Sequence, residues 1–419
     1  MSLDRLAPVR EETRELAQWF AARGHRIFLV GGVVRDAMLG LPLDAAFDLD
    51  FTTDAQPPAV KSILEGWADT LWAQGERFGT VGARRGDRRI EITTHRTERY
   101  QPGSRKPEVA FADVVEADLS RRDFTVNAMA VELPDGDLVD PFGGAADLAD
   151  RRLRTPLDPA ATFSDDPLRM LRAARFLAQF ELSIDRPLVA AMSAMADRLG
   201  IVAGERIRDE LDRLLALPDP TSGFALLFET GLAERVLGPV GDGVAAVARL
   251  GRVGDDPTVR LAVLLAEAGT PADVRAALAE RRATTATGRA VFAVLTAARR
   301  AIEQPPRTLP ELRRWVVDAR GLVAQSVEVA SALGDAGALA ADVRSLTEAE
   351  PDLCGPPVID GGEVMALLGL DPGPDVGTAV EELRRHRLDT GPLTAEQARV
   401  HLLEWQRSQT SEHTSGHKV

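Results

Sequence analysis

The sequence predicts an α+β protein, in which a mixed region of strands and helices over residues 1–150 precedes a longer all-helical part. Two observations support this division. Short apolar runs bounded by glycine turns, which are typical of strands, occur only in the first 150 residues. Beyond them, alanine- and leucine-rich segments repeat their apolar residues at helical spacing. With 419 residues the chain is long enough for two or more domains.

The stretch FLVGGVVRDAMLGLPLDAAFDLDF, residues 28–51, is the most informative part of the first region. It predicts a strand over 27–30, a glycine turn, a short helix over 33–39 and a second strand over 47–51. Side chains alternate across a strand, so Asp48 and Asp50 share the face opposite Phe47, Leu49 and Phe51. Two carboxylates on one face suit a hard divalent cation such as Mg²⁺, which also takes water and substrate phosphates as ligands. The alternative is a solvated strand edge.

The glycine turn predicts an anion site beside these carboxylates. Gly31 and Gly32 lead into a helix N-terminus, where free N–H groups and the helix dipole favour a phosphate. Arg35, on the same helix, is placed to reach that anion. A simple turn is the alternative. Together the two features indicate a metal ion and a triphosphate close to each other.

The remainder of the first region predicts helices over 1–24 and 58–72 and a hairpin with strands over 80–84 and 89–94. Glu91 faces away from the core and is a candidate to complete a carboxylate trio with Asp48 and Asp50; the alternative is an ion pair with a nearby arginine. Residues 96–107 predict a mobile loop made basic by four residues. These are Arg96, Arg99, Arg105 and Lys106.

The segment SRRDFTVNAMA, residues 120–130, places charged residues beside a core-forming run. Arg122, with Asp123 and Asn127 nearby, suits contacts to a phosphate or ribose, although surface ion pairs are the alternative. The sequence DPFGG, residues 140–144, predicts a turn that closes the mixed region.

Residues 163–181 predict a buried helix, because its apolar residues leave almost no polar face. We expect Ser164 or Asp165 to cap it, with Pro167 in its first turn. The helix nevertheless carries Arg169, Arg172 and Arg175, and buried arginines need anionic partners. Their three-residue spacing winds them round the helix, so the three are not expected to serve one atom.

Asp166 and Arg169 lie one turn apart and can point at one target. Cytosine and adenine both present an exocyclic amine beside a ring-nitrogen acceptor, so a carboxylate can accept from the amine while a guanidinium donates to the ring nitrogen. Uracil and guanine present a carbonyl and an N–H at these places and are disfavoured by polar mismatch. This pair is therefore a candidate selector of C and A.

The all-helical part predicts an amphipathic helix over 204–216, hairpins over 221–300, a proline-rich linker over 303–311, further helices from Leu312 and a disordered end over 408–419. Paired short helices with glycine turns are expected after Ile359.

Composition excludes several classes of protein. A net charge of −14 argues against an overall basic nucleic-acid binder, so any RNA contact must use local basic patches. The single cysteine, Cys354, excludes a disulfide framework and a CxxC zinc site and suits a reducing cytoplasm. No signal core and no apolar run of membrane length is seen, which predicts a cytoplasmic protein without a membrane partner.

Five motifs in this order, GGVVRD, DLD, RRDFTVNAMA, DPFGG and DDPLRMLRAARF, resemble those of the class II tRNA nucleotidyltransferase and bacterial poly(A) polymerase family. The resemblance is specific over residues 27–215 and weak to about 405. It implies a polymerase-beta-like head over 1–150, a neck over 151–216, a body over 217–302 and a tRNA-binding tail over 303–407.

The resemblance also implies roles for individual residues. Asp48 and Asp50 would hold Mg²⁺; Gly32 and Arg35 would bind the triphosphate. Arg122 would contact the nucleotide, with Asp123 and Asn127 close by. The nucleotide-binding helix would carry Asp166, Arg169, Arg172 and Arg175. The family usually has Glu-Asp before this helix, where this chain has Asp165-Asp166.

The activity implied is template-independent addition of C, C and A to the 3′ end of tRNA, with CTP and ATP as substrates. GERFGTV at 75–81 resembles the tRNA-tailing branch rather than the basic stretch of poly(A) polymerases, and the loop over 96–107 favours complete CCA addition. A-only or CC-only addition and poly(A) synthesis are the alternatives, and a non-catalytic tRNA-binding protein is a further one. No histidine lies between His95 and His386, so we expect no appended His-Asp phosphohydrolase site. The sequence predicts no oligomeric state.

Overall fold

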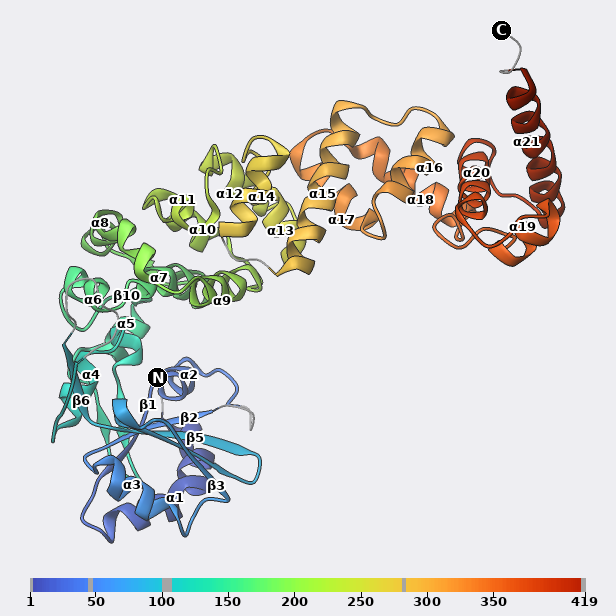
Figure 1. Cartoon of the computed structure of the whole chain (residues 1–419). Coiled ribbons are helices and arrows are strands. Elements are labelled where there is room, and N and C mark those ends of the chain that lie inside the picture. Colours follow the sequence, from blue (N-terminus) through green and yellow to red (C-terminus); the bar gives the residue numbers. More distant parts are fainter. Residues whose placement is uncertain (1–2, 44–47, 100–107, 281–283, 416–419) are drawn as a thin grey trace. The chain divides into compact units, whose positions relative to one another are not determined.

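A computed structural model of the chain describes residues 3–43, 48–99, 108–280 and 284–415 (Figure 1). Its internal contacts divide it into two compact units. The first unit comprises residues 1–247 with 280–282, and the second comprises 248–279 with 283–419. The boundary at 247/248 falls inside the segment 217–302 predicted as one body domain, and the finer division into head, neck, body and tail stays a prediction.

The first unit is built on a seven-stranded sheet with the strand order β3-β4-β5-β2-β1-β8-β9. Strands β2 and β5 pair in parallel, and the other neighbours in this sheet are antiparallel. The α+β class is thereby confirmed. The strands are β1 Ile27–Val30, β2 Leu49–Thr53, β3 Thr70–Gly75, β4 Thr80–Arg85, β5 Arg88–Thr94, β8 Ala130–Glu132 and β9 Leu138–Val139.

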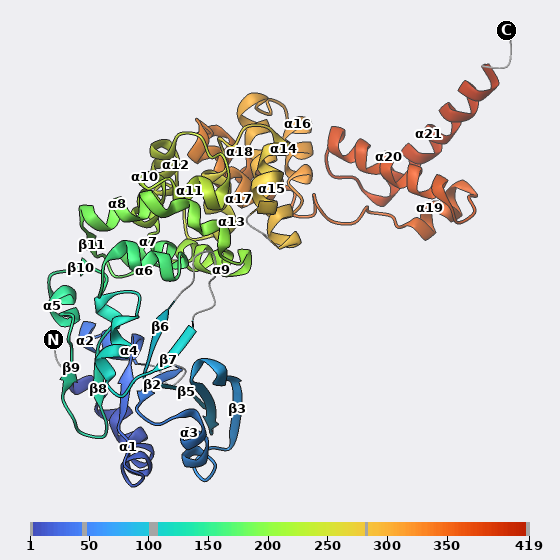
Figure 2. The ribbon, with the colours of Figure 1, turned by 60° about the vertical axis from the view of Figure 1, so that its left-hand side comes forward.

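Helices pack against this sheet and bury its apolar side chains. Helices α1 and α3 lie on one side of it in both ribbon views (Figures 1 and 2). Phe28, Phe51 and Ile92, from three neighbouring strands, are almost completely buried. The helices here are η1 Asp4–Leu6, α1 Ala7–Ala21, α2 Gly32–Leu39, α3 Pro57–Leu64, η2 Glu76–Phe78, α4 Val115–Ser120, η3 Thr125–Asn127 and α5 Gly144–Ala149.

Two sequence-based expectations for this region were wrong in part. The helix predicted over 58–72 ends as α3 at Leu64, and Thr70 begins β3. Residues 65–67 form a turn, and Gly66 leaves no room for a side chain there, since a Cβ would come within 2.8 Å of Trp19. The loop predicted over 96–107 begins as a strand: β6 Arg96–Arg99 pairs with β7 Glu108–Phe111. Arg105 and Lys106 lie outside the described residues.

The predicted buried helix is interrupted near its start. Ser164 and Asp165 lie in the last turn of α6 Pro159–Asp165 and do not cap the next helix, α7 Leu168–Gln179. Asp166 lies between α6 and α7 and has an extended backbone (φ −140°, ψ 101°), because the ring of Pro167 disfavours helical backbone in the residue before it. The Asp166 carboxylate accepts a hydrogen bond from the Leu168 N–H at 3.2 Å and so caps α7.

The rest of the first unit is helical, except for one short two-stranded sheet. The strand signal was expected to disappear after residue 150, but β10 Arg152–Leu153 pairs in parallel with β11 Ser183–Ile184. The remaining helices up to the unit boundary are α8 Arg186–Met195, η4 Ala196–Ile201, α9 Gly204–Leu215, α10 Thr221–Glu229, α11 Leu232–Leu237 and α12 Gly243–Leu250.

The described part of the second unit is helical. Its proline-rich linker is shorter than predicted, because a capping box between Thr308 and Glu311 begins α16 at Leu309. Helix α21 extends to Ser415, and the disordered end predicted over 408–419 stays a prediction. The helices are α13 Pro257–Leu264, α14 Pro271–Glu280, α15 Thr285–Glu303, α16 Leu309–Asp318, α17 Val323–Leu333, α18 Gly337–Ala349, α19 Gly361–Leu368, α20 Pro374–Thr390 and α21 Ala395–Ser415. No helix in the described residues is long and apolar enough to cross a membrane.

Buried His95 gives the first unit a pH-dependent stability. Its ring lies 5.6 Å from that of Phe28 and its Nδ1 lies 2.8 Å from the Thr52 hydroxyl. Burial lowers the pKa of His95 from 6.5. The unfolded chain therefore takes up a proton below pH 6.5 that the folded chain resists, so stability is complete above pH 6.5 and declines below it.

We expect the free energy of unfolding to fall by up to about 1.4 kcal/mol per pH unit through this group as the pH drops below 6.5. Urea unfolding of the wild type and of His95→Gln between pH 7 and 5.5 measures the effect. The variant should lose less stability on acidification, and equal slopes for the two proteins would contradict this role of His95.

Candidate active site

Three predicted site residues converge where β1 turns into α2. Gly31 has φ of 76° and ψ of −136°, a conformation that favours glycine. A Cβ at Gly31 would lie 3.5 Å from a terminal guanidinium nitrogen of Arg122 and 3.7 Å from Asp50 Oδ2. The turn thus places a carboxylate and a guanidinium beside the N-terminus of α2, whose first residue is Gly32. Backbone N–H groups and a cation at one point form a site for a phosphate next to a carboxylate.

Asp50 lies in β2 and Asp48 directly precedes it, because β2 begins at Leu49 rather than at Phe47; the alternating burial is as predicted. Leu49 and Phe51 are buried, whereas Asp48 and Asp50 are exposed. The protein that surrounds the Asp50 carboxyl partly desolvates it and raises its pKa to about 6. The negative charges of Glu91 and Asp48 act in the same direction, while Arg122 opposes them. Accumulated negative charge of this kind is what a divalent cation neutralises, so the donor set fits a hard metal ion.

Glu91 lies directly across from Asp50 in the parallel pair of β2 and β5. Its carboxylate accepts a hydrogen bond from Arg89 at 3.0 Å, which is the alternative that the sequence left open. No group of three or more histidine, cysteine or acidic side chains in the described part of the chain is arranged to hold a metal ion. A metal ion here would have the aspartate pair and substrate oxygens as its ligands, and the metal-binding role of Asp48 and Asp50 and a catalytic role of Glu91 both stay predictions.

Arg35 is buried rather than free in solvent. Its guanidinium donates to Asp36 Oδ1 at 2.8 Å and to Asn127 Oδ1 at 2.6 Å, and it lies 4.3 Å from the Phe180 ring centre. The Asn127 amide donates in turn to Asp123 Oδ1 at 3.0 Å. Helix α2 is thereby linked, through Arg35 and Asn127, to the segment that carries Asp123.

Asp123 connects this chain of contacts to α7. Its Oδ2 accepts two hydrogen bonds from Arg172, at 2.6 and 2.8 Å. The pKa of Asp123 falls to about 2, because the charge of Arg172 and hydrogen bonds from Asn127 and Arg172 outweigh the desolvation by burial. Asp123 is therefore an ionised, structural carboxylate rather than a proton donor.

The three arginines of α7 do not serve one atom, as their spacing predicted, although Arg172 and Arg175 both pair with Glu210, Arg172 at 3.5 Å. Arg172 reaches Asp123, and Arg175 donates to Glu210 on α9 at 2.7 Å. Arg169, only 9% exposed, donates to the backbone carbonyls of Thr162 and Arg121, the latter at 2.6 Å. Five N–H donors belong to a guanidinium, so Arg169 retains donors for a ligand.

Asp166 keeps a partner that sequence reasoning did not identify. Arg206 on α9 donates to its Oδ2 at 2.7 Å. Glu210, one turn later, accepts from Arg175 and from Arg213. Arg206 and Glu210 are four residues apart in GERIRDEL, residues 204–211, so they lie on the same face of this helix. That spacing is the sequence signal that could have identified them as a pair facing α7. Arg122 also has a partner that was missed, the buried Asp118 at 3.1 Å.

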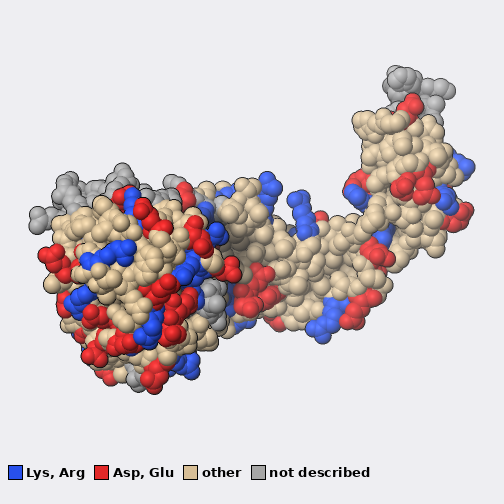
Figure 3. All heavy atoms as spheres, turned by 90° about the horizontal axis from the view of Figure 1, so that it is seen from below, with Lys and Arg blue, Asp and Glu red and all other residues tan. Residues whose placement is uncertain are grey.

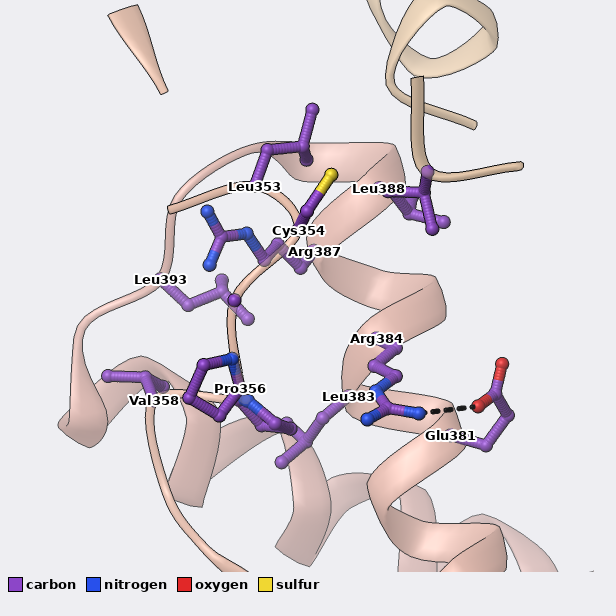
Figure 4. Close-up of a pocket in the computed structure, with 13 residues that line it drawn as sticks. Leu353, Cys354, Pro356, Val358, Glu381, Leu383, Arg384, Arg387, Leu388 and Leu393 are labelled. Carbon is purple, nitrogen blue, oxygen red and sulfur yellow. Dashed lines mark ion pairs between the residues drawn. The ribbon is translucent and has the colours of Figure 1, made fainter. Parts of the chain in front are cut away.

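Charged side chains and a hollow also lie elsewhere in the chain. Figure 3 shows a face of the molecule on which acidic and basic side chains are interspersed. A hollow of about 230 Å³ in the second unit, bordered by α20 and residues 353–358, is mostly apolar and contains Cys354 and Arg387 (Figure 4). None of the predicted site residues lines it.

Comparisons with known proteins agree with the geometry. The family profile "Poly A polymerase head domain" matches residues 27–154, and "Probable RNA and SrmB- binding site of polymerase A" matches residues 181–242. The CCA-adding enzyme of Levilactobacillus brevis is 37% identical over 233 residues, which are 55% of this chain and 57% of that enzyme. The CCA-adding enzyme of Geobacillus thermodenitrificans is 38% identical over 216 residues, 51% of this chain and 52% of that enzyme. The chain thus matches little more than half the length of these curated relatives.

Solved structures resemble nearly the whole chain. That of the Bacillus stearothermophilus CCA-adding enzyme in complex with CTP covers 98% of this chain and 100% of its own, with 26% identity and a TM-score of 0.73. The Thermotoga maritima CCA-adding enzyme complexed with tRNA shares the fold, with 20% identity, 96% of each chain covered and a TM-score of 0.72. The motifs, the sheet and these matches agree: residues 27–154 are similar to poly(A) polymerase head domains, residues 181–242 are similar to the RNA-binding segment of polymerase A, and nearly the whole chain shares its fold with CCA-adding enzymes.

Proposed function

We propose that this protein completes the 3′ end of tRNA in the cytoplasm, adding C, C and A from CTP and ATP by Mg²⁺-dependent nucleotidyl transfer with release of pyrophosphate. The observation that carries the proposal is the convergence of Asp50, Arg122 and the Gly31 turn at the N-terminus of α2. The similarity to CCA-adding enzymes supports the choice of RNA substrate.

In this mechanism Asp48 and Asp50 hold the metal. When bound, Mg²⁺ neutralises charge on the transferring phosphate and on the oxygens that attack and leave. Arg122 and the free N–H groups at the start of α2 hold the triphosphate in line with the RNA 3′ hydroxyl. Arg35, buried and bonded to Asn127, fixes the helix whose N-terminus does this work.

Base selection falls to Asp166 and Arg169. Asp166 accepts from the exocyclic amine of cytosine or adenine, and Arg169 donates to the adjacent ring nitrogen. Its two bonds to backbone carbonyls hold the Arg169 guanidinium in place. The hydrogen bond from Arg206 orients the Asp166 carboxylate. Since both side chains are anchored, U and G meet a mismatched donor and acceptor without room to adapt.

The test uses purified protein, Mg²⁺ and three tRNA transcripts that end before CCA, after C and after CC. Each receives CTP, ATP or both. Growth of all three to a full CCA end, followed by a stop, is the expected result. Extension of the CC-ended transcript alone means an A-adding enzyme, and an arrest at CC means a CC-adding enzyme. Long A tails on unrelated RNA mean a poly(A) polymerase, and tRNA binding without incorporation means a non-catalytic protein.

Asp166→Ala should relax base choice. Without the carboxylate, the exocyclic amine of C or A loses its acceptor and the carbonyl of U or G loses its repulsion. We expect the preference for CTP over UTP, measured as the ratio of kcat/KM values, to fall at least about ten-fold, which corresponds to about 1.4 kcal/mol. Asp165→Ala, one residue earlier, is the comparison. An unchanged ratio in Asp166→Ala would exclude this role.

A further inference from the structure

The hollow beside α20 combines an apolar lining with an arginine that has no anionic partner. Eight of the thirteen residues that line it have an apolar side chain, and two of them, Leu353 and Leu383, are buried. The charged residues of the lining are Glu381, Arg384 and Arg387. The volume of about 230 Å³ lies below the range of about 300–1,000 Å³ that is usual for drug-sized ligands, so the hollow has room for a small molecule.

Arg387 is the charged residue of this lining that lacks a partner. Its guanidinium makes no ion pair and no hydrogen bond within the described part of the chain. The Nε atom is also closed off from solvent. A buried donor without an acceptor costs free energy, and such donors are rare in folded proteins. An acceptor supplied by a ligand would remove that cost.

The charges of the lining favour a single carboxylate. Arg384 pairs with Glu381 at 3.6 Å, so the charges of these two cancel and Arg387 leaves one positive charge. A carboxylate presents two oxygens that match two adjacent N–H groups of a guanidinium. The apolar side chains of the lining are shielded from water only if the rest of the ligand is apolar as well. A ribose phosphate has polar groups on most sides and does not meet that condition.

We propose that this hollow binds a small monocarboxylic acid, whose carboxylate pairs with Arg387 while its apolar chain packs against the apolar lining. Figure 4 shows Arg387 and Cys354 at one end of the hollow, and Pro356 and Leu383 at the other. The carboxylate therefore lies at the Arg387 end and the chain extends toward Pro356. No residue of the candidate active site takes part, so this inference is independent of the proposed function.

Cys354 reports occupancy of the hollow without any substitution. It is the only cysteine of the chain, it is exposed, and it lines the hollow. Alkylation of the full-length protein by neutral iodoacetamide, followed by intact mass spectrometry, therefore has one site. Saturating octanoate should slow this reaction at least about five-fold, with half of the effect at about 1 mM or below.

Two related compounds separate the contribution of the charge from that of the apolar chain. Octanol keeps the chain but lacks the carboxylate, so it should bind at least about ten-fold more weakly. Butyrate keeps the carboxylate but lacks four CH₂ groups, each of which strengthens binding about four-fold when buried, so it should bind at least about fifty-fold more weakly. Equal slowing by octanol and octanoate would overturn the carboxylate site.

Two variants address the two ends of the hollow. Arg387→Gln removes the cation and should weaken octanoate binding at least about ten-fold. Val358→Asp adds a negative charge to a side chain of the lining that is 44% exposed, so the fold should tolerate it while protection of Cys354 by octanoate is lost. The matched variants are Arg344→Gln and Val400→Asp, an exposed arginine and a 47% exposed valine of the same unit that do not line the hollow. Both should keep the wild-type protection.

The outcomes distinguish between kinds of ligand. No slowing by octanoate in the wild type would overturn the proposal, and so would unchanged slowing in Arg387→Gln and Val358→Asp. Slowing by tRNA but not by octanoate would assign the hollow to an RNA contact instead. A protein that completes CCA ends but fails this test refutes only the acid site, whereas octanoate binding by a protein that adds no nucleotide refutes only the proposed function.

Discussion

Asp50→Asn is expected to abolish nucleotide addition. The substitution keeps the size of the side chain but removes the charge that, under the proposed function, would hold the divalent ion together with Asp48. We expect kcat/KM to fall by at least about a thousand-fold, which corresponds to about 4 kcal/mol of transition-state stabilisation. Single-turnover incorporation of labelled CTP into a tRNA transcript that ends before CCA measures the loss. A fall below ten-fold would show that Asp50 is not a metal ligand.

The same substitution should raise stability in metal-free buffer. The raised pKa of Asp50 means that the folded protein disfavours its charged form, through desolvation and the charges of Glu91 and Asp48. Removing the charge therefore favours the folded state near neutral pH. The Tm of Asp50→Asn in EDTA should equal or exceed that of the wild type. The exposed Asp87→Asn, in the turn between β4 and β5, should change neither activity nor Tm.

Glu210→Ala is expected to produce the largest loss of stability. Glu210 is 4% exposed, and its carboxylate accepts from Arg175 at 2.7 Å and from Arg213 at 3.1 Å. Without it, the buried Arg175 keeps its charge and loses its anion. Breaking one side of a buried pair costs about 3–5 kcal/mol, and chemical denaturation will show this as a lower free energy of unfolding.

Two further variants separate charge from packing. Asp197→Ala breaks an exposed pair with Arg235 and should cost less than about 1 kcal/mol. The double variant Glu210→Leu with Arg175→Met removes both buried charges and should recover much of the stability lost in Glu210→Ala. If Glu210→Ala is no more destabilised than Asp197→Ala, the buried cluster does not stabilise the unit.

Local sequence signals were sufficient to predict the backbone and the burial pattern around the candidate site. Alternation along β2 separates Asp48 and Asp50 from the buried Leu49 and Phe51, and a glycine turn before a helix needs no distant residue to be recognised. Spacing alone also predicted that the α7 arginines serve several partners.

Features that depend on distant residues were not predictable in this way. Arg206 and Glu210 are separated from α7 in the sequence by β11, α8 and η4. Their spacing places them on one face of α9, but only packing decides which residue in or next to α7 each contacts. The residues of strand β6 are polar and resemble a loop, and the strand forms because Glu108–Phe111 pairs with it. Likewise Trp72 lies in what seemed a helix, but β4 supplies hydrogen-bond partners that favour a strand.

Pro167 has an effect beyond its own position. Its ring keeps Asp166 extended and separates α6 from α7, so the direction of the Asp166 carboxylate is set by a backbone constraint. In a continuous helix, each residue is rotated by about 100° from the last, and Asp166 would point elsewhere relative to Arg169. If Asp166 and Arg169 select the incoming base, the accuracy of that selection depends in part on Pro167, which has no polar side-chain atom.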